Sequence, residues 1–271
     1  MGWFWNGRCR SLARLDGKTA IITGANTGIG KVTARDFLTR GARVILACRD
    51  TAKAEEACRE IQEAEVNAKG GSLVVKHLDL SSFASVRIFA DEILEEEQAL
   101  HLLVNNAGVM MCPKMLTEDG YELHFATNHL GHFLLTLKLL PLLVKSAPSR
   151  VVNVSSMAHI LANSMKFDDI NLDKGYKPVT AYARSKLANI LFTKELARRL
   201  EGKGVNVYSL HPGVVNTELT RHVDTAFFPG SRWLYHAVGS WLMKSPVQGA
   251  QTTIFCSVDE QTADQSGLYY E

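Results

Sequence analysis

Short apolar runs rich in β-branched residues alternate with longer helical segments, and this alternation limits the fold more than any other feature of the sequence. Apolar runs of five or six residues are typical of buried strands. Strands that alternate with helices predict one parallel sheet covered by helices on both faces. The strands are expected at 19–23, 43–47, 73–77, 100–104, 150–154, 205–210 and 268–270, and the helices at 31–40, 51–65, 81–96, 118–143, 181–200 and 248–258.

The 271 residues fit a single domain, because no Pro-rich or Gly-rich linker divides the chain. Single α/β domains reach this length with a large core. We predict an α/β fold in which about seven strands form a Rossmann-type, doubly wound parallel sheet with helices on both faces. Residues 1–15 would form an amino-terminal extension. Ligands of such sheets bind at the carboxyl ends of the strands, where the strand order reverses.

A glycine-rich turn follows the first predicted strand. The sequence Gly24-Ala25-Asn26-Thr27-Gly28-Ile29-Gly30 leads directly into a helical segment. Glycines allow positive φ and let backbone N–H groups approach a pyrophosphate at a helix amino terminus. The spacing G-x-x-x-G-x-G differs from the usual G-x-G-x-x-G of dinucleotide folds. Taken alone, the glycine cluster is also compatible with a simple tight turn.

Tyr182 and Lys186 lie four residues apart in a predicted helix, which places both side chains on one face. Free tyrosine titrates near pH 10, and a fixed cation beside it favours the phenolate. Ser155 and Ser156 end the preceding predicted strand. This combination predicts a proton donor, although a tyrosine and a lysine at this spacing also occur as a solvated pair on helix surfaces.

Five short motifs occur along the chain in a fixed order. They are T-G-x-x-x-G-I-G at 23–30, N-N-A-G at 105–108, Asn128, Ser156, and Y-x-x-x-K at 182–186. Together they resemble the short-chain dehydrogenase/reductase family over about residues 15–271. Within that family, five further strings are similar to the retinol dehydrogenase branch, which contains microsomal and mitochondrial retinal reductases. These strings lie at 24–31, 47–50, 109–113, 128–133 and 211–215.

The resemblance implies roles for four catalytic residues. Tyr182 would exchange a proton with the substrate oxygen, Lys186 would lower the pKa of the tyrosine and hold the nicotinamide ribose, and Ser156 would orient the substrate oxygen. Ser155 competes with Ser156 on chemical grounds. Asn128 would hold a water that links Lys186 to solvent, or it would instead satisfy a backbone kink in its helix.

The same resemblance implies a nicotinamide cofactor. The expected cofactor-binding residues are Gly24, Asn26, Thr27, Gly28, Ile29, Gly30, Arg49, Asp79, Leu80, Asn106, Ala107, Gly108, Tyr182, Lys186, Pro212, Gly213, Val215 and Thr217. Asp79 could instead cap the next helix, a role for which Ser81 and Ser82 compete.

The residue after the second strand predicts which cofactor is bound. An acidic residue there would accept hydrogen bonds from the adenosine ribose 2′-hydroxyl, whereas a basic residue suits a 2′-phosphate. Arg49 occupies this position, and we therefore predict NADP(H). Arg49 could instead form a surface ion pair with Asp50 or Glu56, and Asp50 would oppose the prediction if its side chain turned inward.

Residues 215–244 are unusually aromatic, and in this fold the corresponding stretch commonly covers the active site. An apolar cover suits a lipophilic aldehyde or alcohol such as retinal or a lipid-derived aldehyde. The expected substrate-binding residues are Ser156, Phe227, Phe228 and Trp233. The aromatic residues could instead pack a helix onto the sheet or onto a membrane. The long connection before Tyr182 predicts an additional flap at 157–179.

Charge and cysteine content argue against other classes of protein. A net charge of +2 gives no reason to expect nucleic acid. Five cysteines without a C-x-x-C pair suggest neither a disulfide framework nor a zinc site, and they fit a reducing, intracellular compartment. His129 and His132 have a spacing used by metal ligands, but no carboxylate or cysteine accompanies them, so no metal is expected.

The amino terminus is aromatic at residues 3–5 but too short to span a bilayer. This end or residues 215–244 could contact a membrane peripherally, or the amino-terminal aromatic residues could pack on the domain. Relatives in the retinol dehydrogenase branch are commonly anchored through this end and continue past the segment that matches 267–271. We therefore expect a trimmed chain or a short natural form, either facing the cytosol on the endoplasmic reticulum or another organelle membrane, or cytoplasmic.

The sequence thus predicts an NADP(H)-dependent oxidoreductase that interconverts a lipophilic alcohol and its aldehyde or ketone. Retinol and retinal are the expected pair, with reduction as the expected direction; lipid-derived aldehydes, steroids and small carbonyls are alternatives. A catalytically silent dinucleotide-binding sensor or scaffold is a different class, which the loss of Tyr182 or Lys186 would favour, and both residues are present. The resemblance also implies a homodimer through the helices at 118–143 and 181–200.

Overall fold

The structure is a computed structural model that describes residues 7–66, 70–216 and 243–271. Its strands are β1 (Thr19–Thr23), β2 (Arg43–Cys48), β3 (Ser72–His77), β4 (Leu102–Asn105), β5 (Ser149–Val154), β6 (Val205–Leu210) and β7 (Tyr269–Tyr270). They form one sheet in the order β3-β2-β1-β4-β5-β6-β7, and every neighbouring pair is parallel. The predicted seven-stranded parallel sheet is therefore confirmed.

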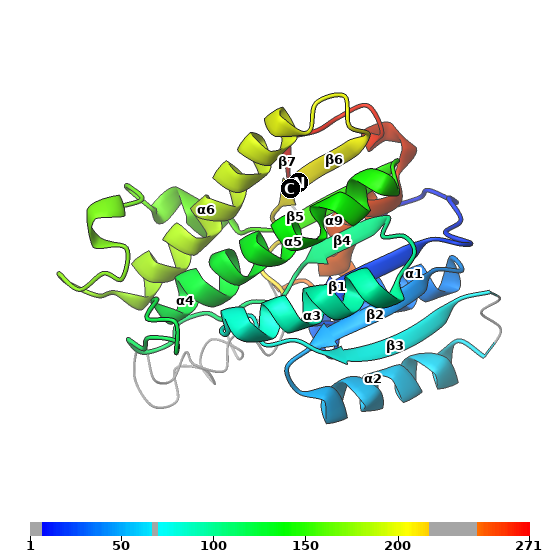
Figure 1. Ribbon diagram of the computed structural model, residues 1–271, viewed down its shortest axis with the longest axis horizontal. Helices are drawn as coiled ribbons and strands as arrows, with labels where there is room; N and C mark the ends of the chain where they lie inside the picture. The colour runs from blue at the N-terminus through cyan, green and yellow to red at the C-terminus, as the bar shows by residue number, and fades with distance from the viewer. Residues whose placement is uncertain (1–6, 67–69, 217–242) are drawn as a thin grey trace.

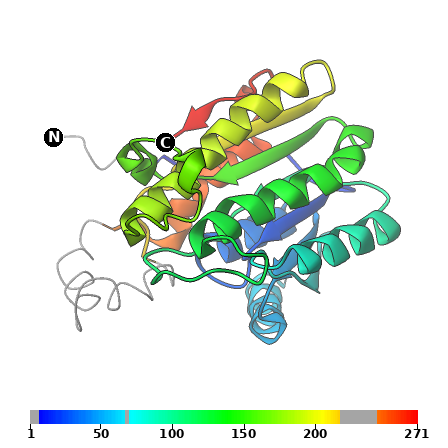
Figure 2. The same cartoon turned by 60° about the vertical axis from the view of Figure 1, so that its left-hand side comes forward.

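Helices cover both faces of this sheet (Figure 1). They are α1 (Gly28–Thr39), α2 (Thr51–Ala64), α3 (Phe83–Glu96), α4 (Leu123–Phe125), α5 (Gly131–Lys145), α6 (Pro178–Arg199) and α9 (Pro246–Val258). Phe37 of α1 and Ile254 of α9 belong to one buried apolar core, whereas Phe89 of α3 and Leu139 of α5 belong to a second. Figure 2 turns the molecule so that the helices are seen on opposite sides of the strands. The strands are apolar on both faces because both are covered.

Side-chain caps set where two of the helices begin. Asp50 accepts a hydrogen bond of 3.0 Å from the backbone N–H of Lys53 at the start of α2. Ser82 accepts one of 3.3 Å from the backbone N–H of Ser85 at the start of α3. Ser82, and not Asp79, therefore caps α3, and the carboxylate of Asp50 is directed to its own helix.

The strand order reverses at β1, which lies between β2 and β4. The turns after β1 and β4 are consequently neighbours. The hydroxyl oxygen of Thr23 accepts hydrogen bonds of 2.9 Å from the backbone N–H groups of both Asn106 and Ala107. One side chain therefore joins the two turns at the point where ligands of such sheets bind.

Buried side chains in the middle of the sheet hydrogen bond to both long helices. Asn105 of β4 and Asn153 of β5 are register partners, and Asn105 Nδ2 donates to Asn153 Oδ1 at 2.8 Å. Asn105 also donates to the hydroxyl of Thr136 on α5, and Asn153 donates to the hydroxyl of Thr193 on α6, each at 2.9 Å. Because each helix is bonded to a different strand, these four side chains fix α5 and α6 along the sheet.

The helix predicted at 118–143 begins later than expected, at Leu123. A turn with Gly120 at φ +80° precedes it, and the carboxylate of Glu122 accepts hydrogen bonds from two backbone N–H groups at the helix start. The π-helix η1 (Ala126–Leu130) then separates α4 from α5. The predicted start was wrong because Asp119-Gly120, a dipeptide typical of turns, precedes the helix.

The connection between β5 and α6, residues 157–177, is referred to as the flap. It contains the 3₁₀ helices η2 (Met157–Leu161) and η3 (Phe167–Asp169). A further 3₁₀ helix, η5 (Glu260–Thr262), follows α9. The flap therefore has regular structure of its own beside α6.

All five cysteines are free thiols, and four of them are buried. Burial raises the pKa of Cys48 to about 11 and that of Cys256 to about 12. Every helix in the described part of the chain is too short or too polar to span a bilayer.

We expect Asn153→Ala to lower the free energy of unfolding by about 2–3 kcal/mol, because it removes hydrogen bonds to two buried partners. Chemical denaturation measures this difference. Asn206→Ala on β6 is the matched control, since Asn206 makes an exposed hydrogen bond to Ala263, and its cost should stay below about 1 kcal/mol. Equal costs would contradict a special role for the buried pair.

Candidate active site

A cleft runs along the carboxyl ends of the strands. It consists of two cavities of about 230 and 450 Å³, which share Gly24, Asn26, Thr27, Ala107 and Gly108 as lining residues. The smaller cavity is also lined by Gly28, Ile29, Gly30, Asn106, Ser155, Ser156, Tyr182, Lys186, His211, Pro212, Gly213 and Val215. The larger cavity is also lined by Arg49, Lys53, Asp79, Leu80, Val109, Cys112 and Thr127.

The glycine turn after β1 lets the backbone line the cleft closely. Gly24 has φ +63° and Gly28 has φ +55°, in the left-handed region that favours glycine. A Cβ atom on Gly30 would lie 2.5 Å from the carbonyl oxygen of Gly24, so no larger residue fits there. Thr27 makes no side-chain cap at the start of α1, which leaves the first N–H groups of this helix available to an anion.

Two buried polar atoms at the cleft find no hydrogen-bond partner among the described residues. They are Nδ1 of His211 in the smaller cavity and Oγ1 of Thr127 in the larger one. Together with the glycine turn and the start of α1, they fit an elongated anionic ligand with its own polar groups. A dinucleotide has these properties.

Helix α6 places Tyr182 and Lys186 at the smaller cavity. The ammonium nitrogen of Lys186 lies 5.6 Å from the centre of the Tyr182 ring and donates a 3.0 Å hydrogen bond to the carbonyl of Val154. Burial lowers the pKa of Lys186 to about 8. At pH 7 the ammonium is therefore still mostly charged, and Tyr182 has a cation beside its ring.

The two adjacent serines differ in their contacts. The hydroxyl of Ser155 is buried and donates a 2.7 Å hydrogen bond to the backbone carbonyl of Lys186. The hydroxyl of Ser156 accepts a 3.1 Å hydrogen bond from the backbone N–H of Ala158. Ser155 therefore uses its hydroxyl hydrogen to hold α6, whereas Ser156 can still donate into the cavity.

Asn128 lies behind the cleft, on the π-helix η1. Its Oδ1 accepts from the backbone N–H of Val109 at 2.8 Å, and its Nδ2 donates to the carbonyl of Val109 at 3.0 Å and to the hydroxyl of Ser185 at 2.9 Å. A Cβ on Gly108 would lie 3.2 Å from Asn128 Oδ1 and 3.6 Å from Lys186 Nζ. Because Gly108 has no side chain, the side chains of Asn128 and Lys186 can both lie close to its backbone.

Arg49 lies at the larger cavity beside the end of β2. Its side chain is 63% exposed, and its guanidinium lies 4.0 Å from the carboxylate of Asp79. The carboxylate of Asp50 caps α2, and Asp50 is also one of the residues that line this cavity. Lys53 adds a second basic residue to this lining, which the sequence analysis missed. Its position in the first turn of α2, close to Arg49, could have indicated it.

The two histidines with metal-ligand spacing are each hydrogen bonded within the fold. His132 Nε2 lies 2.8 Å from the hydroxyl of Thr23, and its Nδ1 lies 3.1 Å from the carbonyl of Asn128. His129 Nδ1 lies 3.0 Å from Asn189 Oδ1. Burial lowers the pKa of His132 to about 3 and that of His129 to about 4, so both rings are neutral at pH 7. Within the described ranges, no group of three or more His, Cys, Asp or Glu side chains could hold a metal ion.

The structure brings most of the predicted site residues to the cleft. Asn128 reaches the cleft only through the residues that it contacts. Thr217, Phe227, Phe228 and Trp233 lie outside the described residues. The sequence analysis did not identify Lys53 or Thr127, and no motif marks Thr127.

Comparison with known proteins identifies the family. Residues 18–226 match the family described as short chain dehydrogenase. The chain belongs to the short-chain dehydrogenases. It is 51% identical over 265 residues to Retinol dehydrogenase 11 of Mus musculus, covering 98% of this chain and 81% of that protein. It is 50% identical over 268 residues to Retinol dehydrogenase 12 of Homo sapiens, covering 99% of this chain and 82% of that protein.

These relatives place this short-chain dehydrogenase in the retinol dehydrogenase branch, as its motifs predicted. Solved structures agree on the fold. A crystal structure of an uncharacterized protein from Mycobacterium Paratuberculosis is 38% identical, with a TM-score of 0.74 over 96% of this chain and 82% of that chain. The Pseudomonas aeruginosa RhlG/NADP active-site complex is 27% identical, with a TM-score of 0.72 over 97% of each chain.

The lowered pKa of Lys186 makes stability depend on pH. Below pH 8 the folded protein buries a charged ammonium, whereas the unfolded chain keeps its proton up to its ordinary pKa of 10.5. The contribution of Lys186 to the free energy of unfolding therefore increases as the pH rises from 8 to 10.5. Relative to Lys186→Met, the wild type should gain about 2–3 kcal/mol in free energy of unfolding between pH 7 and 10.

Urea unfolding of both proteins across this range measures the change. Lys194→Met removes an exposed ammonium from the same helix and is the matched control. A constant difference between the wild type and Lys186→Met would contradict the lowered pKa.

Proposed function

We propose that this short-chain dehydrogenase is an NADP(H)-dependent oxidoreductase that reduces retinal, or a similar lipophilic carbonyl, to the alcohol. One observation carries the proposal: Tyr182, Lys186 and Ser156 meet at one end of a glycine-lined cleft. The substrate class is supported by relatives named retinol dehydrogenases, with which the chain shares about half of its residues.

The four proposed catalytic residues have different roles in the reduction of the carbonyl. When bound, NADPH supplies the hydride that the carbonyl carbon receives. Tyr182 donates its phenolic proton to the carbonyl oxygen, so that the product is a neutral alcohol. Lys186 favours the phenolate that this transfer leaves behind. Ser156 donates a hydrogen bond to the same oxygen and orients it, and Asn128 positions the backbone beside Lys186.

The cofactor would be held by backbone along most of the cleft. The glycine turn and the start of α1 suit its pyrophosphate, because their N–H groups can reach an anion without a side chain in between. Asp79 and Leu80 would contact the adenine, and Pro212, Gly213, Val215 and Thr217 would support the nicotinamide and the pyrophosphate. Arg49, with Lys53 on the same cavity, favours a 2′-phosphate and hence NADP(H).

Val215 and Lys244, the two ends of the proposed substrate cover, lie at the cleft. Val215, which lines the smaller cavity, pairs with Lys244 in a short parallel bridge. The side chain of Lys244 lies against Gly213, where a Cβ would come within 2.7 Å of it. Both ends of the intervening segment are therefore fixed beside the proposed nicotinamide site. This supports a role for residues 215–244, including Phe227, Phe228 and Trp233, in covering a lipophilic substrate.

Other functions fit fewer observations. Lipid-derived aldehydes, steroids and small carbonyls would use the same proton donor, and their kinetic constants would rank them. A catalytically silent sensor or scaffold would not need Tyr182, Lys186 and Ser156 together at the cleft. Exposed apolar side chains on α5 and α6, such as Phe133 and Leu191, support a homodimer through these helices. Free cysteines support an intracellular location.

Replacing Tyr182 with phenylalanine tests the proposed proton donor. The variant keeps the ring but loses the hydroxyl, so turnover of all-trans-retinal with NADPH should fall by about two orders of magnitude or more. NADPH affinity, measured by its fluorescence on binding, should change little. Medium-chain aldehydes and steroids assayed in parallel rank the alternative substrates. Turnover close to the wild-type value would reject Tyr182 as the donor.

Arg49→Ala tests the cofactor preference. Loss of a charge-assisted hydrogen bond should weaken NADPH binding by about 1.5–3 kcal/mol and leave NADH binding nearly unchanged. Titration of both cofactors against the same protein measures the two affinities. Arg59→Ala, an exposed arginine on α2, is the matched control for the loss of a positive charge. Equal weakening of NADPH and NADH by Arg49→Ala would mean that Arg49 does not contact the 2′-phosphate.

A further inference from the structure

The loop that follows β4, residues 109–113, is held in a conformation that the chain would not adopt by itself. Met111 has φ +59°, a left-handed value that costs free energy for a residue with a side chain. Val109 and Cys112 line the larger cavity of the cleft. Contacts from outside must therefore hold this loop, referred to below as the β4 loop.

Two side chains on the consecutive helical segments α4 and η1 hold the two ends of the β4 loop. Asn128 makes two hydrogen bonds to the backbone of Val109, as described above. His124, one helical turn earlier, accepts a 3.1 Å hydrogen bond at its Nε2 from the backbone N–H of Cys112. Asn128 thus holds the start of the loop, and His124 holds its far end.

The contacts of His124 determine which of its nitrogens carries the proton. Nε2 accepts a hydrogen bond, so the proton lies on Nδ1, which donates to the carboxylate of Glu122 at 2.7 Å. An imidazolium would direct its Nε2–H at the N–H of Cys112 and break this contact. Burial raises the pKa of Glu122, but the interactions of its carboxylate with His124 and with the backbone N–H groups of His124 and Phe125 outweigh burial and leave that pKa lowered. The buried pair therefore consists of a carboxylate and a neutral imidazole.

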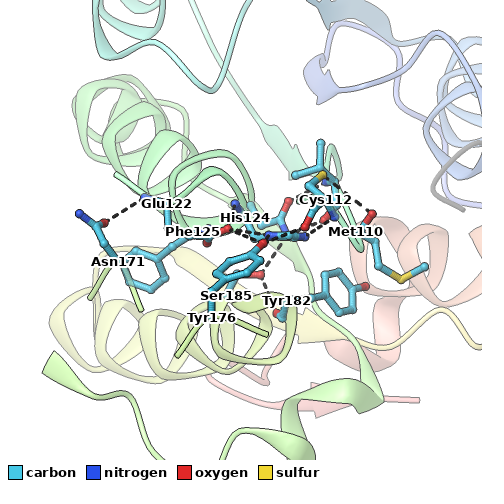
Figure 3. Close-up of polar contacts among 11 residues, drawn as sticks. Met110, Cys112, Glu122, His124, Phe125, Asn171, Tyr176, Tyr182 and Ser185 are labelled. Atoms are coloured by element: carbon cyan, nitrogen blue, oxygen red, sulfur yellow. Dashed lines mark hydrogen bonds and ion pairs between the residues drawn. The ribbon is translucent and has the colours of Figure 1, made fainter. Parts of the chain in front are cut away.

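The flap joins the same cluster through Tyr176 (Figure 3). The phenol of Tyr176 donates a 2.8 Å hydrogen bond to the carbonyl of Cys112 and lies 3.3 Å from His124 Nδ1. Asn171, also in the flap, accepts a 3.0 Å hydrogen bond from the backbone N–H of Glu122. Cys112 is therefore bound on both sides of its backbone, by His124 at its N–H and by Tyr176 at its carbonyl.

The cluster lies directly beside Tyr182. The ring of His124 meets the ring of Tyr182 edge to face, with 6.4 Å between their centres. Arg184, two residues further along α6, is buried and donates to the flap carbonyl of Asp169 at 3.3 Å. Its guanidinium also lies 6.0 Å from the centre of the Phe125 ring. The flap, the β4 loop and α6 thus meet at His124.

We propose that His124 is a positioning residue, which fixes the β4 loop and the flap beside Tyr182 and so shapes the cleft around the proposed proton donor. The proposal rests on the function proposed above, in which Tyr182 protonates a lipophilic carbonyl. His124 donates no proton to the substrate. It acts by accepting from Cys112 while it donates to Glu122, and only one tautomer does both.

Two amide variants separate the two hydrogen bonds of His124. In His124→Gln, the longer side chain can bring a carbonyl oxygen to the former place of Nε2 and accept from Cys112. In His124→Asn, the shorter side chain can still donate to Glu122 but does not reach Cys112. The two substitutions are chemically alike and differ in which partner they keep. They therefore serve as controls for each other.

Hydrogen exchange of the backbone around residues 109–116 and steady-state kinetics should respond together. In His124→Asn, exchange in this loop should accelerate, and kcat/KM for all-trans-retinal should fall by about tenfold, the effect of one lost hydrogen bond. The KM for NADPH should stay within about twofold of the wild type, and His124→Gln should restore most of the loss. The fall in kcat/KM should be smaller for a small aldehyde that does not reach the β4 loop than for all-trans-retinal.

Equal behaviour of the two variants, whether both are impaired or neither is, would overturn the proposal. If His124→Asn does not fold, Tyr176→Phe removes only the hydroxyl that holds the carbonyl of Cys112. Faster exchange in residues 109–116 together with a lower kcat/KM for retinal would then support the proposal, and unchanged exchange would overturn it. Exchange needs no turnover, so a wild-type protein inactive on every carbonyl would reject the proposed function separately.

Discussion

The hydrogen bond between Asn105 and Asn153 in the middle of the sheet is the interaction on which the rest of the site depends. These amides also bind Thr136 on α5 and Thr193 on α6, which fixes two helices that approach the cleft from the same face. The segment before α5 contains Asn128, and α6 contains Tyr182 and Lys186. A shift of either helix by one residue, about 1.5 Å, would break this line of bonds.

Thr23, His132 and Asn128 form a chain of buried hydrogen bonds behind the cleft, in which each hydrogen has one place. Thr23 accepts from two backbone N–H groups, so its hydroxyl hydrogen is directed to His132. His132 therefore carries its own proton on Nδ1 and donates it to the carbonyl of Asn128. A continuous set of contacts thus connects the end of β1 with the π-helix that holds Asn128. Such a network is costly to leave incomplete, which favours a single arrangement of the site.

Much of this architecture could be predicted from local patterns. The apolar runs located the strands, and the glycine spacing with the Y-x-x-x-K motif identified the cleft and the family, because both features depend on residues close together in the chain. The sequence did not distinguish the two serines by chemistry. The contact between Ser155 and the backbone of Lys186 does so, but it joins residues 31 apart.

The network around His124 was missed for the same reason. Its members, Cys112, Glu122 and Tyr176, come from separate segments, and only Cys112 lies in one of the strings that resemble the retinol dehydrogenase branch. The turn before α4 and the position of Lys53 are different cases. Asp119-Gly120 is a dipeptide typical of turns, and the place of Lys53 in the first turn of a helix beside Arg49 was also visible in the sequence. The contacts that could not be predicted from the sequence are therefore those between segments far apart in the chain.

The buried thiols have a consequence for the chemical durability of the protein. With a pKa of about 11, Cys48 is a thiolate in only roughly one molecule in ten thousand at pH 7, against roughly three in a hundred for a free cysteine. Cys256 is protected still further by its pKa of about 12. Alkylating and oxidising agents attack the thiolate, so these two residues resist both. The aldehydes of the proposed function would therefore meet a protonated thiol at Cys48, which lines the cleft.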